Sequence, residues 1–559
     1  MNPSDDVPKA DFPNADPDRL AALTSWDADW SGLRVVVTGI TKTGFSAADT
    51  LAELGARVVV VAASDDGEAR RNADTLRIVG VADVLLGEET STRLPQVDGE
   101  QAELVVTTPG MRPSHPLLVA AAAAGIPVWG DIELAWRVRI RAGRKTADWI
   151  TITGTNGKTT TTTMVELMLQ AGGLRAIAAG NIGTPILDTV REPEGYDVLA
   201  VELSTFQLHW IHTVSPAASV CLNLAEDHVD WHGSFAAYAA DKAKIYANTR
   251  LACVYNAEQD ETERMVEAAD VVEGCRAIGF TTGIPAISMV GVVDGLLVDR
   301  AFIAERKHSA VELAKVSDIA ELVPRHLVAN ALAAAALVRA YGLEPGAIRD
   351  GLHRYESGEH RIQPVASVNG VLWVNDSKAT NAHAAAASLS AFDSVIWIAG
   401  GLSKGVNYDE LIRRHGHRLK AVILIGADTS ALSGSLRRHA PDVPVIETRT
   451  GQTGNVQTGN VQTGKVQTGK VQTGKVQTAG DTQPPDTQPG RGGPPLSGET
   501  VMARAVASAA SIALRGDTVL MAPASASMDQ FASYAQRGEA FISAVRGLVE
   551  GQAKAGKEF

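Results

Sequence analysis

Short apolar runs alternate with longer amphipathic or alanine-rich stretches along most of the chain. Near the N-terminus, residues 33–64 contain the run RVVVT, a glycine turn, a stretch with helical spacing and a second run, RVVVVA. Uninterrupted apolar runs of this length are typical of strands covered on both faces, as in parallel sheets. The pattern predicts a strand, a helix and a parallel strand in that order.

The same alternation begins again twice. The second start is the run DWITIT before Gly154, followed by the runs VLAVEL, ASVCLNL and LACVYNA. The third start is VLWVN, followed by SVIWIAG, AVILIGA and DTVLMAP. A chain of 559 residues is also too long for one core. We therefore predict three α/β domains, over residues 1–147, 148–357 and 358–559.

Two segments stand outside this alternation. Residues 1–30 are an acidic N-terminal arm. The arm lacks the basic and apolar regions of a secretory signal. Residues 450–495 contain a five-residue repeat of the form QTGxV and a tail rich in Pro, Gly and Asp. Such a composition cannot bury a core, so we predict a disordered surface insertion in the third domain.

Charge and cysteine content exclude several functions. The formal net charge of −13 would repel a nucleic-acid backbone, and no apolar run is long enough to span a membrane. Three cysteines without a C-x-x-C pair favour reduced, mostly buried thiols over disulfides or zinc. We expect a cytoplasmic monomer that neither binds nucleic acid nor inserts into a membrane.

The stretch TITGTNGKTTT is the strongest chemical motif. Gly154 and Gly157 allow backbone N–H groups to approach an anion, Lys158 adds a charge, and Thr159 offers a magnesium ligand at the start of a helix. Ile152 stands where the usual eight-residue pattern has glycine. The sequence therefore predicts a shortened phosphate-binding loop.

Two further strand ends carry possible magnesium ligands. Glu202 closes the run VLAVE, and the segment EDHVDWH gathers His228 with three carboxylates and a second histidine after the next strand. Carboxylate oxygens suit magnesium held at nucleotide phosphates. Taken alone, Glu202 is equally explained as a helix N-terminal charge, and His228 as a packed structural residue.

The first glycine turn resembles a dinucleotide fingerprint but departs from it. Thr41 replaces the middle glycine, and the second strand ends in VVVVAAS without an acidic residue. These departures weaken the NAD interpretation, whereas a nucleotide-sugar diphosphate stays physically possible, since Gly39 and Gly44 leave backbone donors at a helix start. In the third domain, NDSKATN, AGGLSKG and APASASMDQF each follow a strand, so we expect three polar loops to meet at one edge of the last sheet.

The motifs GTNGKTT, GNIGTP, VELSTFQL, EDHVD, EHR, NDSKATN and SASMDQFASYAQRG occur in the order and spacing of the Mur ligase family, which nearly the whole chain resembles. The resemblance implies an N-terminal Rossmann-like domain for a UDP-sugar, a central P-loop ATPase-like parallel sheet and a C-terminal Rossmann-like domain. It is nearest to the members that add D-glutamate to UDP-N-acetylmuramoyl-L-alanine through an acyl phosphate, in peptidoglycan precursor synthesis. It further implies ATP, two Mg²⁺ sites, and carbon dioxide to carbamylate a lysine.

The resemblance also assigns roles to individual residues. The catalytic set is Lys158, Glu202, His228 and Lys242, and the metal ligands are Thr159, Glu202, His228 and carbamylated Lys242. ATP would contact Gly154, Asn156, Gly157, Lys158, Thr159, Thr160, Asn330, Arg361, Asp376 and Lys378. The UDP-substrate would contact Lys42, Thr43, Thr108, Pro109, Gly110 and Asn181. D-Glutamate would contact Thr380, Lys404, Ser527, Met528 and Tyr534.

Three positions depart from the family pattern. These are Thr41 in the first turn, Leu327 where the family often has asparagine, and Tyr534 where it commonly has phenylalanine. The alternatives are another Mur ligase, a folylpolyglutamate synthase-like ligase, or a non-catalytic nucleotide-binding protein of the same fold. The segment LSKGVN stands where the diamino-acid-adding member has its signature, which favours D-glutamate, and the broken first fingerprint disfavours a dehydrogenase.

Overall fold

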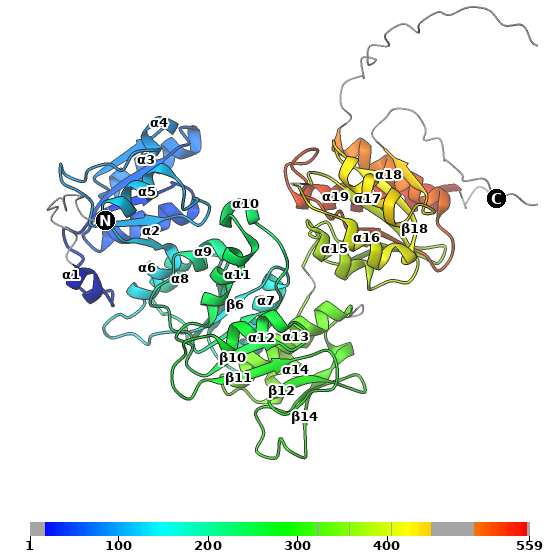
Figure 1. Cartoon of the computed structure of the whole chain (residues 1–559), viewed down its shortest axis with the longest axis horizontal. Coiled ribbons are helices and arrows are strands. Elements are labelled where there is room, and N and C mark those ends of the chain that lie inside the picture. Colours follow the sequence, from blue (N-terminus) through cyan, green and yellow to red (C-terminus); the bar gives the residue numbers. More distant parts are fainter. Residues whose placement is uncertain (1–16, 321–322, 357, 404, 449–496, 556–559) are drawn as a thin grey trace, which may run out of the picture. The chain divides into compact units, whose positions relative to one another are not determined.

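The computed structural model describes residues 17–320, 323–356, 358–403, 405–448 and 497–555, and Figure 1 shows their helices and strands. The repeat insertion and most of the acidic arm lie outside these residues. The chain separates into two compact units, residues 1–356 and 357–559. Among the described residues, no helix is both long and apolar enough to cross a membrane.

The first sheet is entirely parallel and has the order β3-β2-β1-β4-β5. Its strands are β1 (Arg34–Thr38), β2 (Arg57–Ala62), β3 (Asp83–Leu86), β4 (Leu104–Thr107) and β5 (Val128–Gly130). The helices of this part are α1 (Pro17–Ala22), α2 (Lys42–Glu53), α3 (Gly67–Ile78), α4 (Glu88–Ser91), α5 (Pro116–Ala123) and α6 (Asp131–Val138). The order reverses between β1 and β4, where open α/β sheets bind ligands.

The second sheet has nine strands in the order β14-β13-β12-β11-β10-β9-β6-β8-β7. Its strands are β6 (Asp148–Thr153), β7 (Ala176–Gly180), β8 (Val198–Glu202), β9 (Ala218–Cys221), β10 (Ala252–Asn256), β11 (Arg276–Phe280), β12 (Met289–Val293), β13 (Leu296–Asp299) and β14 (Val311–Lys315). The pairing is parallel from β7 to β12, but β12 to β14 pair antiparallel. The predicted parallel sheet is confirmed from β7 to β12, and the last two strands extend it antiparallel, since no helix lies between β12 and β13 or between β13 and β14 in the described residues.

The helices of the second part include one, α13, whose middle is fully buried. They are α7 (Lys158–Ala171), α8 (Ile186–Arg191), α9 (Thr205–His209), α10 (Val229–His232), α11 (Phe235–Ala243), α12 (Asp260–Glu267), α13 (Arg325–Ala340) and α14 (Pro345–His353), with 3₁₀ turns η1 (Lys244–Tyr246) and η2 (Val316–Asp318). α7 packs against α13 and α14 (Figure 1). The middle of α13, ALAAAALV, is fully buried, since alanine allows helices to approach closely.

One apolar core joins the first two sheets. It includes Val35 and Val58 of the first sheet together with Leu199 and Val201 of the second. At the seam, the buried Glu133 carboxylate accepts hydrogen bonds from the backbone of His212 and Thr213 and pairs with Arg137. Because apolar burial is continuous across this seam, the two sheets form one compact unit.

The unit of residues 357–559 contains a six-stranded sheet of order β15-β16-β20-β17-β18-β19. Its strands are β15 (Gln363–Val368), β16 (Val371–Asn375), β17 (Val395–Gly400), β18 (Leu419–Ile425), β19 (Val445–Glu447) and β20 (Thr518–Met521). Its helices are α15 (Ala382–Leu389), α16 (Asp409–His415), α17 (Ser430–His439), α18 (Gly498–Ile512) and α19 (Tyr534–Ala555), with the 3₁₀ turn η3 (Gly416–Arg418). Among the described strands of this unit, β15 alone is antiparallel to its neighbour.

Polar caps fix several helix starts. Asp66 accepts hydrogen bonds from the N–H groups of Glu68 and Ala69 at α3, and Asn381 caps α15 in the same way. Ser204 and Gln207 form a capping box at α9. These side chains satisfy N–H groups that have no partner inside a helix. The predicted α/β fold with three sheets is confirmed, while the predicted bounds of the three domains stay a prediction.

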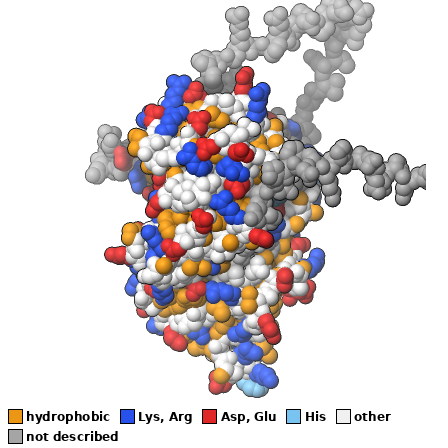
Figure 2. Space-filling view, turned by 90° about the vertical axis from the view of Figure 1, so that its left-hand side faces the viewer, with side chains coloured by type: hydrophobic (Ala, Val, Ile, Leu, Met, Phe, Trp, Pro, Cys, Tyr) orange, Lys and Arg blue, Asp and Glu red, His pale blue; other side chains and the backbone are white. Residues whose placement is uncertain are grey.

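Side-chain charge is mixed on the surface. Figure 2 shows basic and acidic groups interspersed over the face in view, without a continuous area of one sign. An extended basic surface, which nucleic-acid binding requires, is not visible on that face. The expectation that the protein does not bind nucleic acid stays a prediction.

Candidate active site

The phosphate loop connects β6 to α7 at the centre of the nine-stranded sheet. Gly154 has a φ of 156° and Gly157 a φ of 84°, both in the region that favours glycine. The Lys158 ammonium lies back over the loop and donates to the carbonyls of Gly154 at 2.9 Å and Thr155 at 3.1 Å. The N-terminal N–H groups of α7 and this ammonium form a site for an anion.

Asn330 leaves no room for a side chain at position 157. A Cβ at position 157 would lie 2.4 Å from the Asn330 Oδ1. We expect Gly157→Ala to raise the KM for ATP at least about tenfold, because the loop or Asn330 must move. Gly173→Ala is the matched control: its φ of 83° imposes the same backbone cost, but nothing lies within 4 Å of the added Cβ. Equal KM values for ATP in the two variants would contradict this role of the contact.

A second loop, residues 222–228, is bonded to the phosphate loop. Asn156 N–H donates to Asn223 Oδ1 at 2.9 Å, and Asn223 Nδ2 donates to the Asn156 carbonyl at 3.0 Å. The Thr155 hydroxyl lies 2.9 Å from the Tyr238 hydroxyl and accepts from the Ala225 N–H at 3.0 Å. Sequence reasoning missed Thr155, Asn223 and Tyr238. The only signal was their position beside the quoted motifs.

Glu202 ends β8, which neighbours β6. Its side chain is buried, and Oε1 accepts a hydrogen bond from Asn181 Nδ2 at 2.8 Å. Oε2 is buried without a hydrogen-bond partner within the described ranges. A buried carboxylate oxygen without a donor is costly, so the arrangement fits a group that ligates a cation. Asn181 therefore lies beside the candidate metal carboxylate, while its predicted contact with substrate stays a prediction.

His228 precedes the short helix α10. Its backbone is left-handed, with a φ of 52°, and its ring packs edge-on against Phe206 at 4.8 Å between centroids. Burial lowers the pKa of His228 and outweighs the opposing charge of Asp227. The lowered pKa favours the neutral imidazole, which is the form that metals bind.

Lys242 lies on α11 with an exposed fraction of 2%. Its ammonium is 4.8 Å from the centre of the Tyr238 ring, and no carboxylate of the described chain lies within ion-pair distance. Burial, followed by the charge of Lys158, lowers the pKa of Lys242 to about 7. The neighbouring Asp241 is already paired with His209, His232 and Lys244. Lys242 therefore has a substantial fraction of neutral, nucleophilic amine near neutral pH, which an ordinary lysine lacks.

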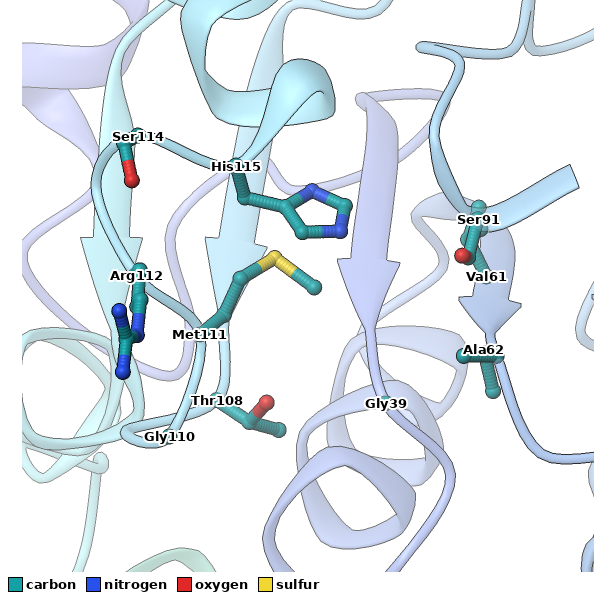
Figure 3. Close-up of a pocket in the computed structure, with 11 residues that line it drawn as sticks. Gly39, Val61, Ala62, Ser91, Thr108, Gly110, Met111, Arg112, Ser114 and His115 are labelled. Carbon is teal, nitrogen blue, oxygen red and sulfur yellow. The ribbon is translucent and has the colours of Figure 1, made fainter. Parts of the chain in front are cut away.

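The first sheet has a cavity of about 520 Å³ at its switch point (Figure 3). Gly39, Thr108 and Gly110 line it together with Val61, Ala62, Ala63, Ser91, Met111, Arg112, Ser114 and His115. Figure 3 shows the Met111 and His115 side chains extending towards the strand that ends at Gly39, with the end of β2, Val61 and Ala62, on the far side of that strand. That end is formed by small apolar residues, so the carboxylate that binds a dinucleotide ribose is absent from the lining.

Two of the predicted UDP-substrate residues line this cavity, and three others lie in its loops or in the adjoining helix start. Thr108 and Gly110 line it, whereas Pro109 belongs to the same loop but not to the lining. Lys42 and Thr43 form the first turn of α2, directly after the Gly39 turn. A Cβ on Gly44 would lie 2.2 Å from the Gly39 carbonyl, which explains the glycine at this close approach. Thr41 precedes α2 without a side-chain cap bond.

The unit of residues 357–559 brings the three predicted polar loops together. β16, β20 and β17 are adjacent and parallel, so their carboxyl ends share one edge. The Ala524 N–H donates to the Ala379 carbonyl at 2.9 Å, and the Leu402 N–H donates to the Ala526 carbonyl at 2.9 Å. The convergence of the three loops is confirmed, while their role stays a prediction.

The predicted ligands in these loops differ in exposure. Ser527 is buried, Met528 is exposed, and the Lys378 ammonium lies 3.8 Å from the centre of the Tyr534 ring. Thr380 is partly exposed at the end of the first loop. Lys404 lies outside the described residues.

Asp376 and Arg361 lie near one another in the same unit. Burial raises the pKa of Asp376 to about 6, and its carboxylate accepts from the Ser388 hydroxyl and from the Ile362 N–H at 3.3 Å. Ile362 has a φ of 41°, so Asp376 stabilises a strained turn next to Arg361. Asn330 belongs to the other unit, and its shared role in ATP binding stays a prediction.

Arg537 is a residue that the sequence interpretation missed. Its guanidinium is buried and donates to the Ser377 hydroxyl at 3.1 Å, the Ser377 carbonyl at 2.9 Å and the Ser525 carbonyl at 3.0 Å. Burial lowers its pKa to about 10. The side chain thus connects the loops after β16 and β20 from the first turns of α19. Arg537 is the arginine of the motif SASMDQFASYAQRG, and its place in that motif was the signal by which the sequence could have indicated it.

Comparisons with known proteins agree with this geometry. The family model described as "Mur ligase middle domain" matches residues 152–338, and "Mur ligase MurD-like, N-terminal domain" matches residues 33–130. A UDP-N-acetylmuramoylalanine--D-glutamate ligase of Leifsonia xyli subsp. xyli is 49% identical over 554 residues, covering 97% of this chain and 98% of the relative. The chain belongs to the Mur ligase family.

Further members of the family are similarly close. The ligase of the same name from Streptomyces avermitilis is 48% identical over 520 residues, covering 93% of this chain and 99% of its own. Among solved structures, MurF ligase from Thermotoga maritima in complex with ADP covers 89% of this chain and 96% of its own, with 16% identity and a TM-score of 0.50. That similarity shows the common fold. Mur ligases use ATP and Mg²⁺ as a family trait.

Proposed function

We propose that this chain is an ATP-dependent ligase that joins D-glutamate to UDP-N-acetylmuramoyl-L-alanine and releases ADP and phosphate. The observation that carries the proposal is the full-length relationship to ligases of that name, at 49% identity. The phosphate loop, the cavity of the first sheet and the three converging loops supply one candidate site for each substrate. We further propose a cytoplasmic monomer.

The reaction has two steps, phosphorylation of the substrate carboxylate and attack by the amine of D-glutamate. An oxygen of the substrate carboxylate attacks the γ-phosphorus of ATP, and ADP leaves, so an acyl phosphate forms. The amine of D-glutamate attacks the carbonyl carbon and loses a proton, and the tetrahedral intermediate then expels phosphate. Lys158 and the N–H groups of the phosphate loop hold the phosphate oxygens as charge moves to ADP.

Side chains around the loop supply candidate ligands for two magnesium ions. Thr159 and the free Oε2 of Glu202 would hold one ion, and neutral His228 with the carbamate of Lys242 would hold the other. When bound, the ions screen the negative charge of the phosphates. The neutral amine of Lys242 is the form that adds carbon dioxide, and the product has the anionic oxygen that a cation site requires.

Phosphate release from ATP tests the proposal. Purified protein with Mg²⁺ and UDP-N-acetylmuramoyl-L-alanine is expected to release phosphate with D-glutamate, and not with L-glutamate, L-alanine or meso-diaminopimelate. Release with a different amino acid would keep the ligase chemistry but overturn the assigned substrate. No release with any of the four would favour a nucleotide-binding protein without turnover.

A further inference from the structure

Two cysteines face one another away from the candidate active site. Cys253 lies on β10 and is buried, and Cys275 immediately precedes β11 and is partly exposed. Their sulfur atoms are 3.8 Å apart. Both side chains contact the apolar core that joins the first two sheets. Neither takes part in the proposed reaction.

The backbone allows the two sulfurs to approach further. β10 and β11 are parallel neighbours, with Cys253 opposite Ala277, and the Cys275 sulfur meets that of Cys253 from the position directly before β11. The paired residues of β11 begin at Arg276, and the Cys275 N–H bonds instead to the Val272 carbonyl within a turn. Cys275 therefore lies outside the ladder, where a small shift towards the disulfide bond length of about 2.05 Å breaks no strand pairing.

The surroundings distinguish the two sulfurs chemically. The hydrogen bond with the Cys253 thiol lowers the pKa of the Cys275 thiol and outweighs the opposing effect of partial burial; the N–H groups of Cys253 and Arg276 add smaller lowering effects. The same thiol pair raises the pKa of Cys253, and burial adds to that rise. Cys275 thus combines the greater thiolate fraction with the greater exposure, which are the two conditions for oxidation. Cys253 lies behind it as a resolving thiol.

We propose that Cys253 and Cys275 form an oxidisable dithiol site that peroxides convert to an intramolecular disulfide. The Cys275 thiolate attacks one oxygen of the peroxide, which gives a sulfenic acid and releases hydroxide or an alkoxide. The Cys253 sulfur then attacks the sulfenic sulfur, and its proton and the sulfenic hydroxyl leave as water. With hydrogen peroxide, two thiols and one peroxide yield one disulfide and two waters. A dithiol reductant reverses the change.

The third cysteine is the internal control. Cys221 lies on β9, is fully buried, and has a pKa raised by that burial. Its sulfur lies 3.8 Å from the Asn223 carbonyl. We expect Cys221 to stay reduced at peroxide concentrations that oxidise the pair, because it is neither exposed nor deprotonated.

The experiment uses the full chain, reduced and then freed of reductant, treated with hydrogen peroxide and blocked with N-ethylmaleimide. Peptide mass spectrometry is expected to find a linkage between Cys253 and Cys275 that dithiothreitol removes, with Cys221 still alkylated after unfolding. Cys221→Ser should form the same linkage. Cys253→Ser, or Cys253→Ala if the serine variant does not fold, should accumulate a sulfenic acid at Cys275 that dimedone traps. Cys275→Ser should form no linkage.

Three outcomes would overturn the proposal. They are full alkylation of the wild-type pair after peroxide, a linkage that includes Cys221, and oxidation of Cys275 to sulfinic acid without any linkage to Cys253. None of these measurements depends on ligase turnover, so the inference stands or fails independently of the proposed function.

Discussion

Replacing Lys242 with alanine is expected to lower turnover at least about 100-fold, since the variant cannot form the anionic ligand proposed for the second cation. Short carboxylic acids added to the assay are expected to restore part of the lost turnover, because they supply the missing carboxylate. Lys244→Ala is the matched control. Lys244 is two residues away but pairs with Asp241 and the His209 carbonyl, so its loss should affect turnover less than about threefold.

Carbamylation itself has a direct readout. With ¹³C-labelled bicarbonate, wild-type protein is expected to show a carbamate resonance that Lys242→Ala lacks. The signal should increase as the pH rises through about 7, because carbon dioxide adds only to the neutral amine and the buried Lys242 loses its proton in that range. Unchanged turnover in Lys242→Ala, or a labelled resonance that persists in it, would contradict the assignment.

Glu202→Gln is expected to produce a comparable loss, at least about 100-fold in turnover, with a higher magnesium concentration needed for half-maximal activity. The substitution preserves the shape of the side chain and an oxygen that can accept from Asn181. It removes the charge on Oε2, the buried oxygen for which the described residues offer no donor. The melting temperature should therefore stay within a few degrees of the wild-type value.

Glu166→Gln serves as the control for that experiment. Glu166 is a partly buried carboxylate on α7, the helix that follows the phosphate loop. Burial raises its pKa. We expect this variant to keep wild-type turnover and magnesium dependence. If Glu202→Gln also keeps them, Glu202 is a structural carboxylate and the proposed cation site is wrong.

Much of the site could be predicted because it is local in sequence. The residues of GTNGKTT lie within one turn and one helix start directly after β6, and glycine, lysine and threonine each have one physical role there. Glu202 was predictable for the same reason, since the end of an apolar run marks the carboxyl edge of a buried strand. The convergence of three loops followed from parallel pairing alone.

Other features depend on residues far apart in the sequence. Asn223 is 67 positions from Asn156, and Arg537 is 160 positions from Ser377, so no local pattern indicates their hydrogen bonds. The low pKa of Lys242 likewise depends on its burial and on the distant Lys158. Sequence reasoning placed Lys242 by family resemblance and had no physical account of its reactivity.

The sequence by itself determined the alternation of strands and helices, the three sheets and the position of the phosphate loop, because backbone preference and apolar periodicity act over a few residues. The tertiary structure decided which side chains became buried, which carboxylate oxygen lacked a donor, and which cysteines met. Desolvation and long-range hydrogen bonds depend on what packs around a group, and packing brings together residues that the sequence separates.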